Sequence, residues 1–247
     1  MKCMIVANWK MNPGSLKEAK KLFAHTKAVS KVRGVSLVVA PPAIYLYELS
    51  KLNRGGRIAL GVQHAHFDAI GPVTGDISMA QARDAKATYA IIGHAERRAR
   101  GETNDDTRKK VMAAFAHQMT PILCVGETER TVSGDYFDVI REQVKVGLKD
   151  VPVPKLTKVI IAYEPVWAIG APAPMSPRDM HEMAIFIRKQ VVERYGDVGL
   201  DMQILYGGAV DSTNAPALLE FGDIKGFLVG RASADRDKVA ALMQSLS

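Results

Sequence analysis

Short apolar runs alternate with helical patterns along the whole chain, and this alternation limits the possible folds more than any other feature. Most of the runs are rich in Val and Ile and lack polar alternation. That pattern is typical of strands buried on both faces of a parallel sheet. The eight runs are Met4–Ala7, Leu37–Ala40, Ile58–Val62, Tyr89–Ile92, Ile122–Val125, Val159–Ala162, Gln203–Tyr206 and Gly226–Val229.

Helix-spaced apolar residues separate these runs and follow recognisable start signals. Ser15 and Ser176 are candidate N-caps, Pro177 suits a first helical position, and another helical pattern follows Asn104. Eight strands alternating with helices in 247 residues favour a closed (β/α)8 barrel over an open doubly wound sheet. The absence of a G-x-G-x-x-G motif and of a Walker loop also weighs against the open sheet. We predict one barrel domain over residues 1–247.

The charge balance restricts the partners. The formal net charge is +7, which suits nucleic acid, membrane surfaces or phosphorylated metabolites. The basic clusters Arg97–Arg100 and Arg108–Lys110 are short and are not interleaved with aromatic residues, so we expect solvated faces there. No apolar run approaches the roughly 20 residues of a membrane span. We therefore expect an anionic small molecule, with no nucleic acid and no membrane partner.

Both cysteines, Cys3 and Cys124, lie inside strand-like runs. Buried free thiols are expected at such positions, and they suit a reducing compartment. A cytoplasmic location follows as an expectation.

Polar side chains follow several of the predicted strands, at the end where a (β/α)8 barrel carries its active site. Asn8 and Lys10 follow the first run, His94 and Glu96 the fourth, and Glu164 the sixth. A carboxylate opposite a neutral imidazole suits proton abstraction next to a carbonyl. Glu164 would take the carbon-bound proton, and His94 would polarise the carbonyl oxygen. Lys10 would supply positive potential to the site. The simpler interpretation of this lysine is a salt bridge to Glu96.

The segment after Glu164 carries large apolar side chains. It reads Pro165, Val166, Trp167, Ala168, Ile169 and Gly170. Pro165 ends the strand because it has no N–H to donate. A carboxylate beneath an apolar cover indicates a base under a lid that excludes water. An ordinary loop beside a helix-terminal carboxylate is the alternative.

Glycine-rich turns after the last two strands are candidate anion sites. Gly207-Gly208-Ala209 and Gly230-Arg231 both precede helices, whose N-terminal N–H groups can bind a phosphate. His64 and His66 raise the alternative of a metal site, but a third ligand is not evident, so we expect no metal. They lie in the long connection Gln63–Ile77, whose length and apolar ends suit insertion into a partner.

These segments resemble the triosephosphate isomerase family in order and spacing. The matching pieces are Ala7–Asn12, Ile91–Arg98, Cys124–Thr128, Ala162–Gly170 and Tyr206–Gly208. The resemblance implies a TIM barrel that interconverts dihydroxyacetone phosphate and D-glyceraldehyde 3-phosphate through an enediolate, with no cofactor and no metal.

The resemblance also implies roles by position. Glu164 would be the base, His94 the electrophile, and Asn8 and Lys10 substrate ligands, with Glu96 as a second carboxylate beside Lys10. The positions that grip the phosphate are Gly170, Ala209, Gly230 and Arg231, and Tyr206 would meet the closed lid. A homodimer is implied, in which the Gln63–Ile77 loop brings Thr74 to the other subunit's site.

Several positions depart from the family pattern. Ala95 and Ala209 replace serines, and Ala171-Pro172-Ala173 replaces Thr-Gly-Lys, with Pro174 following. Arg231 replaces a glycine and would strain its turn if a positive φ were needed there. These changes leave two alternatives open: an isomerase for a related sugar phosphate, such as a tetrulose phosphate, and a non-catalytic relative.

Overall fold

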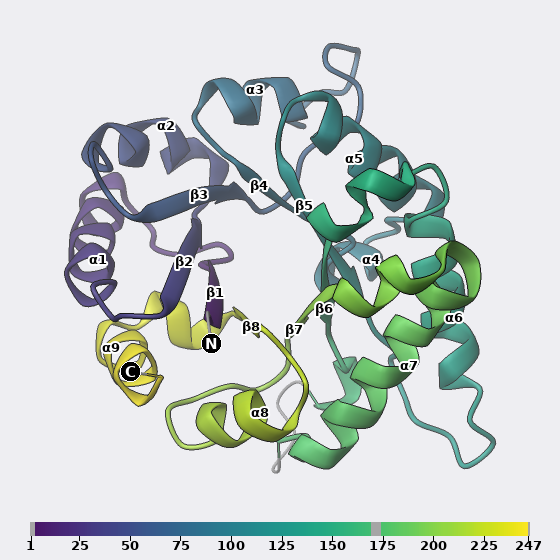
Figure 1. The fold of residues 1–247 in the computed structure, drawn as a ribbon. Helices are drawn as coiled ribbons and strands as arrows, with labels where there is room; N and C mark the ends of the chain where they lie inside the picture. The colour runs from purple at the N-terminus through teal and green to yellow at the C-terminus, as the bar shows by residue number, and fades with distance from the viewer. Residues whose placement is uncertain (1–2, 169–173, 247) are drawn as a thin grey trace.

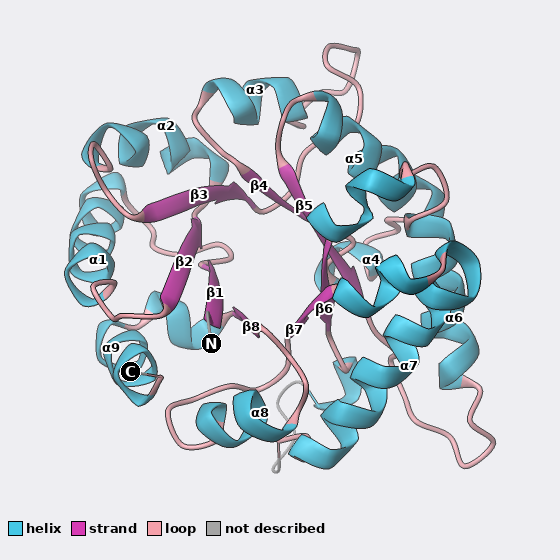
Figure 2. Ribbon diagram, viewed as in Figure 1, coloured by secondary structure: helices cyan, strands magenta, loops and turns pink. Residues whose placement is uncertain are grey.

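The computed structural model describes residues 3–168 and 174–246, which form a closed barrel of eight parallel strands surrounded by helices (Figure 1, Figure 2). Each strand pairs with its sequence neighbours, and β8 closes the barrel on β1. The strands are β1 Cys3–Asn8, β2 Val35–Ala40, β3 Ile58–Val62, β4 Tyr89–Ile92, β5 Thr120–Val125, β6 Ile160–Tyr163, β7 Gln203–Tyr206 and β8 Gly226–Val229.

The barrel prediction is confirmed, and the bounds of β3, β4, β7 and β8 agree with the predicted runs to the residue. The sixth strand begins one residue later than predicted. Val159 still donates its N–H to the carbonyl of Leu156, and this contact ends the preceding 3-10 helix.

The helices and 3-10 turns of the described residues lie between the strands. The helices are α1 Leu16–Val29, α2 Ala43–Leu52, α3 Met79–Asp84, α4 Ala95–Arg98, α5 Asn104–Ala116, α6 Tyr136–Gly147, α7 Pro177–Tyr195, α8 Ala215–Phe221 and α9 Arg236–Ser245. The 3-10 turns are η1 Val153–Lys158, η2 Val166–Ala168, η3 Asp197–Asp201 and η4 Arg231–Ala234.

The predicted helix starts are correct in two cases and shifted in the third. Ser15 and Ser176 cap α1 and α7 by accepting a backbone N–H, and Pro177 is the first residue of α7. The cap of α5 is Thr103, whose hydroxyl accepts from Asp106 in a capping box, so Asn104 is already helical.

Alternate strand residues pack into two separate apolar clusters. Residues such as Val6, Ile122 and Leu228 fill the inside of the barrel, and their sequence neighbours pack outward against the helices. Cys3 and Cys124 are buried free thiols, as expected from their runs. Within the described ranges, no helix has the length and hydropathy to cross a membrane.

The connection between β3 and α3 projects from the barrel as a long loop (Figure 1). Its base is closed by two backbone hydrogen bonds, from His66 to Ile77 at 2.7 Å and from Met79 to His66 at 3.3 Å. Thr74 is exposed near the tip. The loop is thus anchored at the barrel rim while its outer part contacts solvent.

Candidate active site

One cavity of about 460 Å³ opens at the carboxyl ends of the strands. The sequence-predicted residues that line it are Asn8, Lys10, His94, Glu164, Ala209, Gly230 and Arg231. They come from five of the eight strand ends, and only the closure of the barrel brings them together. Gly170 and Ile169, with the hinge residues 171–173, lie outside the described residues.

Glu164 and His94 face each other at the bottom of this cavity. Glu164 Oε1 lies 3.2 Å from His94 Nε2, and the two side chains are 3% and 9% exposed. The second oxygen, Oε2, accepts the backbone N–H of Ala95 at 2.9 Å. Both carboxylate oxygens are therefore held, so the base has a defined position without a serine hydroxyl at residue 95.

The backbone of α4 selects the tautomer of His94. The Nδ1 atom accepts the backbone N–H of Glu96 at 3.1 Å, so it carries no proton of its own. The proton of the neutral ring is then on Nε2, which points toward Glu164. The imidazole can donate a hydrogen bond into the cavity without being charged.

Burial changes the acidity of the base. Burial of the carboxyl group raises the pKa of Glu164, and His94, the Ala95 N–H and Lys10 only partly oppose this effect. The Cys124 thiol below it also has a raised pKa, because it is buried and close to the Glu164 carboxylate. A carboxylate with a raised pKa is a stronger base than an exposed one.

Lys10 lies at the side of the cavity in a strained conformation. Its φ is +52°, in the left-handed region that non-glycine residues rarely adopt. Its amide donates to Asn8 Oδ1 at 3.1 Å, and Gln63 Nε2 donates to its carbonyl at 2.8 Å. These contacts hold the strained backbone, so the ammonium is directed to Glu96 Oε1 at 2.5 Å. The expected salt bridge is therefore present at the cavity.

The other end of the cavity is formed by the turns after β7 and β8. Ala209, Gly230 and Arg231 line it together with Gly207 and Gly208. Lys10 packs on Gly230, where a Cβ atom would lie 3.0 Å from the lysine Cε. The backbone N–H groups and cations of this end make it suitable for a phosphate.

Arg231 does not strain its turn. It is the first residue of the 3-10 turn η4 and is not among the described residues with a positive φ. Its side chain is exposed at the cavity, and Lys238 from the first turn of α9 lines the same cavity. Neither side chain forms an ion pair within the described ranges. Sequence reasoning missed Lys238, because only the path of the last helix places it there.

The first residues after Glu164 are tied to a buried carboxylate. The Trp167 indole N–H and the Tyr163 hydroxyl each donate to Glu127 Oε1 at 2.7 Å. Arg130 lies 3.1 Å from the same oxygen and stacks over the Trp167 ring at 5.0 Å. Val166, Trp167 and Ala168 thus form a short 3-10 turn fixed at its start.

Pro165 is buried beneath this turn, and Tyr206 is buried at the end of β7. Burial raises the pKa of the Tyr206 phenol to about 12. Its oxygen makes no hydrogen bond of normal geometry to the described residues. Gly208 packs against this phenol, since a Cβ atom there would lie 2.2 Å from the hydroxyl oxygen.

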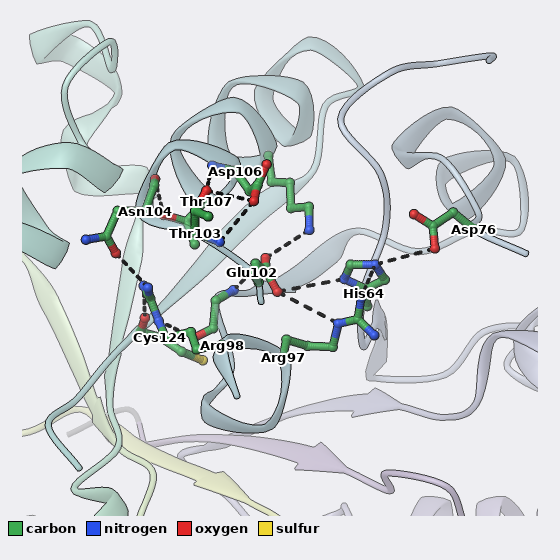
Figure 3. Close-up of polar contacts among 12 residues, drawn as sticks. His64, Asp76, Arg97, Arg98, Glu102, Thr103, Asn104, Asp106, Thr107 and Cys124 are labelled. Carbon is green, nitrogen blue, oxygen red and sulfur yellow. Dashed lines mark hydrogen bonds and ion pairs between the residues drawn. The ribbon is translucent and has the colours of Figure 1, made fainter. Parts of the chain in front are cut away.

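A polar cluster under the long loop holds the backbone before His94 (Figure 3). Buried Glu102 lies 3.0 Å from Lys110 and accepts the N–H of Gly93 at 3.3 Å. Arg98 donates to the carbonyl of Gly93 at 2.8 Å. Gly93 has a φ of +71° and no room for a side chain, so the cluster fixes the turn that presents the imidazole.

The two histidines of the long loop have separate partners. His64 lies 3.1 Å from Arg97 and about 4 Å from Glu102 and Asp76 (Figure 3), whereas His66 accepts the N–H of Asp68. Burial lowers the pKa of His64 to about 4, and Lys110 and Arg97 add to this effect. No group of three or more His, Cys, Asp or Glu residues suited to a metal occurs in the described part of the chain.

The fold and the cavity together define a (β/α)8-barrel enzyme with its site at the strand ends. Residues 3–246 match the family model described as triosephosphate isomerase. Three relatives that carry this name cover nearly the whole chain. The relative from Endomicrobium trichonymphae is 39% identical over 98% of each chain. That from Caldanaerobacter subterraneus is 37% identical over 97% of this chain and 98% of its own. The relative from Aquifex aeolicus is 36% identical over 99% of this chain and 100% of its own.

The chain therefore belongs to the triosephosphate isomerase family. This confirms the resemblance found in the sequence and the expectation of an isomerase.

Proposed function

We propose that this enzyme interconverts dihydroxyacetone phosphate and D-glyceraldehyde 3-phosphate through an enediolate. The observation that carries the proposal is the 3.2 Å contact between Glu164 Oε1 and His94 Nε2 inside a cavity that also holds Lys10. A base and a neutral donor next to one another are what a proton shift beside a carbonyl requires.

The residues of the cavity act in turn in the proposed reaction. Glu164 removes a proton from the carbon next to the carbonyl, and the electron pair moves to the carbonyl oxygen. The Nε2–H of His94 donates to that oxygen and stabilises the developing charge, with Lys10 adding positive potential. His94 then moves a proton between the two oxygens, and protonated Glu164 returns its proton to the neighbouring carbon. Asn8 binds the substrate from the wall, and Glu96 orients the Lys10 ammonium.

The phosphate is proposed to bind at the opposite end of the cavity. The N–H groups near Ala209 and Gly230 support this placement, as does the Arg231 side chain in the same wall. Gly170 is assigned to the phosphate by resemblance alone. The segment from Pro165 to Ile169 is proposed to close over the substrate and to meet Tyr206. Binding energy from the phosphate would then favour the closed, water-free site.

The protein is also proposed to act as a homodimer through the Gln63–Ile77 loop. Ile70 is 90% exposed and Val73 is 37% exposed on this loop, and Met11 after β1 is 93% exposed. Exposed apolar side chains on an anchored, projecting loop favour a protein partner. Thr74 at its tip would then reach the site of the second subunit. A reducing compartment is proposed because both cysteines are free.

The proposal is tested by a coupled assay in both directions with purified protein. We expect turnover of both triose phosphates, and a loss of about 10²–10⁴-fold in kcat for Glu164→Gln. Glu193→Gln on the exposed face of α7 is the matched control and should keep wild-type activity. Absence of turnover, or a fully active Glu164→Gln enzyme, would reject the assignment.

A second candidate is an isomerase of the same mechanism for a longer sugar phosphate. Arg231 and Lys238, both without an ion pair in the described part of the chain, favour it because they add donors beyond those a triose phosphate needs. A higher kcat/KM for a tetrulose phosphate than for either triose phosphate would support it. A non-catalytic role would instead predict no rise in melting temperature with a phosphoglycolate-type analogue.

A further inference from the structure

Gln143 is a buried polar residue that takes no part in the chemistry described above. It lies on α6, is 7% exposed, and both ends of its side-chain amide bind the backbone of one residue. Its Oε1 accepts the N–H of Gly126 at 2.7 Å, and its Nε2 donates to the carbonyl of Gly126 at 3.1 Å. A planar amide therefore clamps a single residue just beyond the end of β5.

These two hydrogen bonds take the place of the backbone hydrogen bonds that a neighbouring strand would form with Gly126. The residues on either side of Gly126 bind the segment that carries the base. The carbonyl of Val125 accepts the N–H of Glu164 at 2.8 Å, and that of Glu127 accepts the N–H of Val166 at 3.0 Å. The polar groups of Gly126 point the other way, toward α6. Without Gln143 they would have no partner in this arrangement, and such groups are costly to leave unpaired.

Gly126 also packs against the main chain of Glu164. A Cβ atom on Gly126 would lie 1.8 Å from the carbonyl oxygen of Glu164. The glycine is thus packed between the Gln143 amide on one side and the main chain of Glu164 on the other. Because of this close packing, we expect a displacement of Gly126 to move the main chain of Glu164 as well.

There is space for such a displacement. A second cavity of about 260 Å³ lies behind the base and is lined by Gly126, Gln143, Glu164, Ala95 and Val166. Packing on this side is therefore incomplete, and the two Gln143 hydrogen bonds hold the turn together with its contact to the main chain of Glu164.

We propose that Gln143 is a positioning residue for the proton transfer. Through Gly126 it fixes the position of the main chain of Glu164. It also fixes the hydrogen bond from the Val166 N–H to Glu127, and Val166 is the second residue of the expected lid. Gln143 does not line the cavity proposed to bind substrate, so its proposed effect is on where the carboxylate lies relative to the reacting carbon. The inference rests on the proposed function, in which Glu164 is the base.

The first test is Gln143→Met, which keeps length and volume and removes both hydrogen bonds. We expect kcat to fall about 10- to 100-fold, since a misplacement of about 1 Å costs on that order, while KM changes less than about threefold. Gln190→Met on α7 is the matched control, because Gln190 accepts a hydrogen bond from Arg141 on the exposed surface and forms none with Gly126 in the described part of the chain.

The second test is Gln143→Glu, whose carboxylate can accept the Gly126 N–H but opposes its carbonyl. The protonated carboxyl group can make both contacts. Activity relative to wild type should therefore rise as the pH falls. If Gln143 only stabilised the fold, both variants would have a lower melting temperature, and their kcat and pH profile would equal those of wild type. That result, or wild-type kcat in Gln143→Met, would overturn the inference.

Amide hydrogen exchange separates this inference from the proposed function. Exchange at the amides of Glu164 and Val166 should be faster in Gln143→Met than in wild type and unchanged in Gln190→Met. If the wild-type protein turns over no triose phosphate, the proposed function fails by itself, and the exchange result then decides whether Gln143 holds this segment.

Discussion

The Nε2 atom of His94 lies 3.2 Å from Glu164 Oε1, while its Nδ1 atom accepts the N–H of Glu96. Without substrate, the proton on Nε2 is thus shared with the base. In the proposed reaction, a bound carbonyl oxygen would replace Glu164 as the acceptor of this hydrogen bond. The imidazole is thus already oriented for this role, and the proposal requires the Glu164 carboxylate to move toward the substrate.

Replacement of His94 by Gln tests this arrangement. We expect kcat to fall by about 10²–10⁴-fold, because the amide can donate a hydrogen bond but cannot pass a proton between two oxygens. Steady-state kinetics in both directions measures the effect. His117→Gln, at the C-cap of α5, is the control and should not change kcat. A His94→Gln enzyme within threefold of wild type would contradict the proposed role.

The raised pKa of Glu164 predicts the acid limb of the pH profile. The base must be ionised, so kcat/KM should fall as the pH falls through an apparent pKa above the ordinary value of 4.5.

The raised pKa of Glu164 also affects the stability of the fold, which depends on pH in the opposite direction to kcat/KM. Above about pH 4.5 the folded state retains a proton that the unfolded state has lost, so this residue's contribution decreases with rising pH.

Urea unfolding of wild type and Glu164→Gln across pH measures this contribution. The free energy of unfolding of wild type, relative to the variant, should decline as the pH rises from about 4.5 through the folded-state pKa. An increase over that range would mean that the carboxylate is stabilised, not destabilised, by its site.

Lys10→Met should separate binding from stability. The ion pair with Glu96 is partly exposed, with side-chain exposures of 27% and 57%, and pairs of this kind contribute about 0.2–1 kcal/mol. A charged hydrogen bond to substrate contributes about 1.5–3 kcal/mol, so KM should rise at least about tenfold. Kinetics and thermal unfolding on the same sample compare the two effects. A large loss of stability with an unchanged KM would place Lys10 outside the binding site.

Arg231→Gly tests the phosphate end of the cavity. Removal of the guanidinium should raise KM severalfold and should weaken the dependence of kcat/KM on ionic strength, because one cation is lost from the cavity wall. Arg236→Gly, just beyond η4, controls for net charge. An equal effect in both variants would show that Arg231 acts through the overall charge alone.

Ile70→Asp tests the proposed dimer loop. Wild-type protein should sediment as a dimer, and the variant should dissociate and lose activity, because a charge replaces an apolar side chain that is 90% exposed on the loop. Ile185→Asp on α7 makes the same change at another exposed isoleucine and should leave the dimer intact. A monomeric wild-type protein would refute the proposed assembly.

Local patterns in the sequence predict all eight strands of this barrel and some of its helices. Apolar runs without alternation define strands buried on both faces, and four of them have the observed bounds. Caps are also local, and the shift from Asn104 to Thr103 arises because the two residues are adjacent and can both start a helix. The strand ends then place Asn8, Lys10, His94 and Glu164 on one rim by the geometry of the barrel alone.

The contacts that depend on residues far apart in the chain required the tertiary structure. Nothing near Gln143 in the sequence indicates that its amide binds Gly126, and nothing near Lys238 indicates that it lines the cavity. The sequence alone determines the strands and helices, because buried residues repeat along the chain with the period of each strand or helix. The closure of β8 on β1 decides which distant side chains meet, and that depends on how all the elements pack at once.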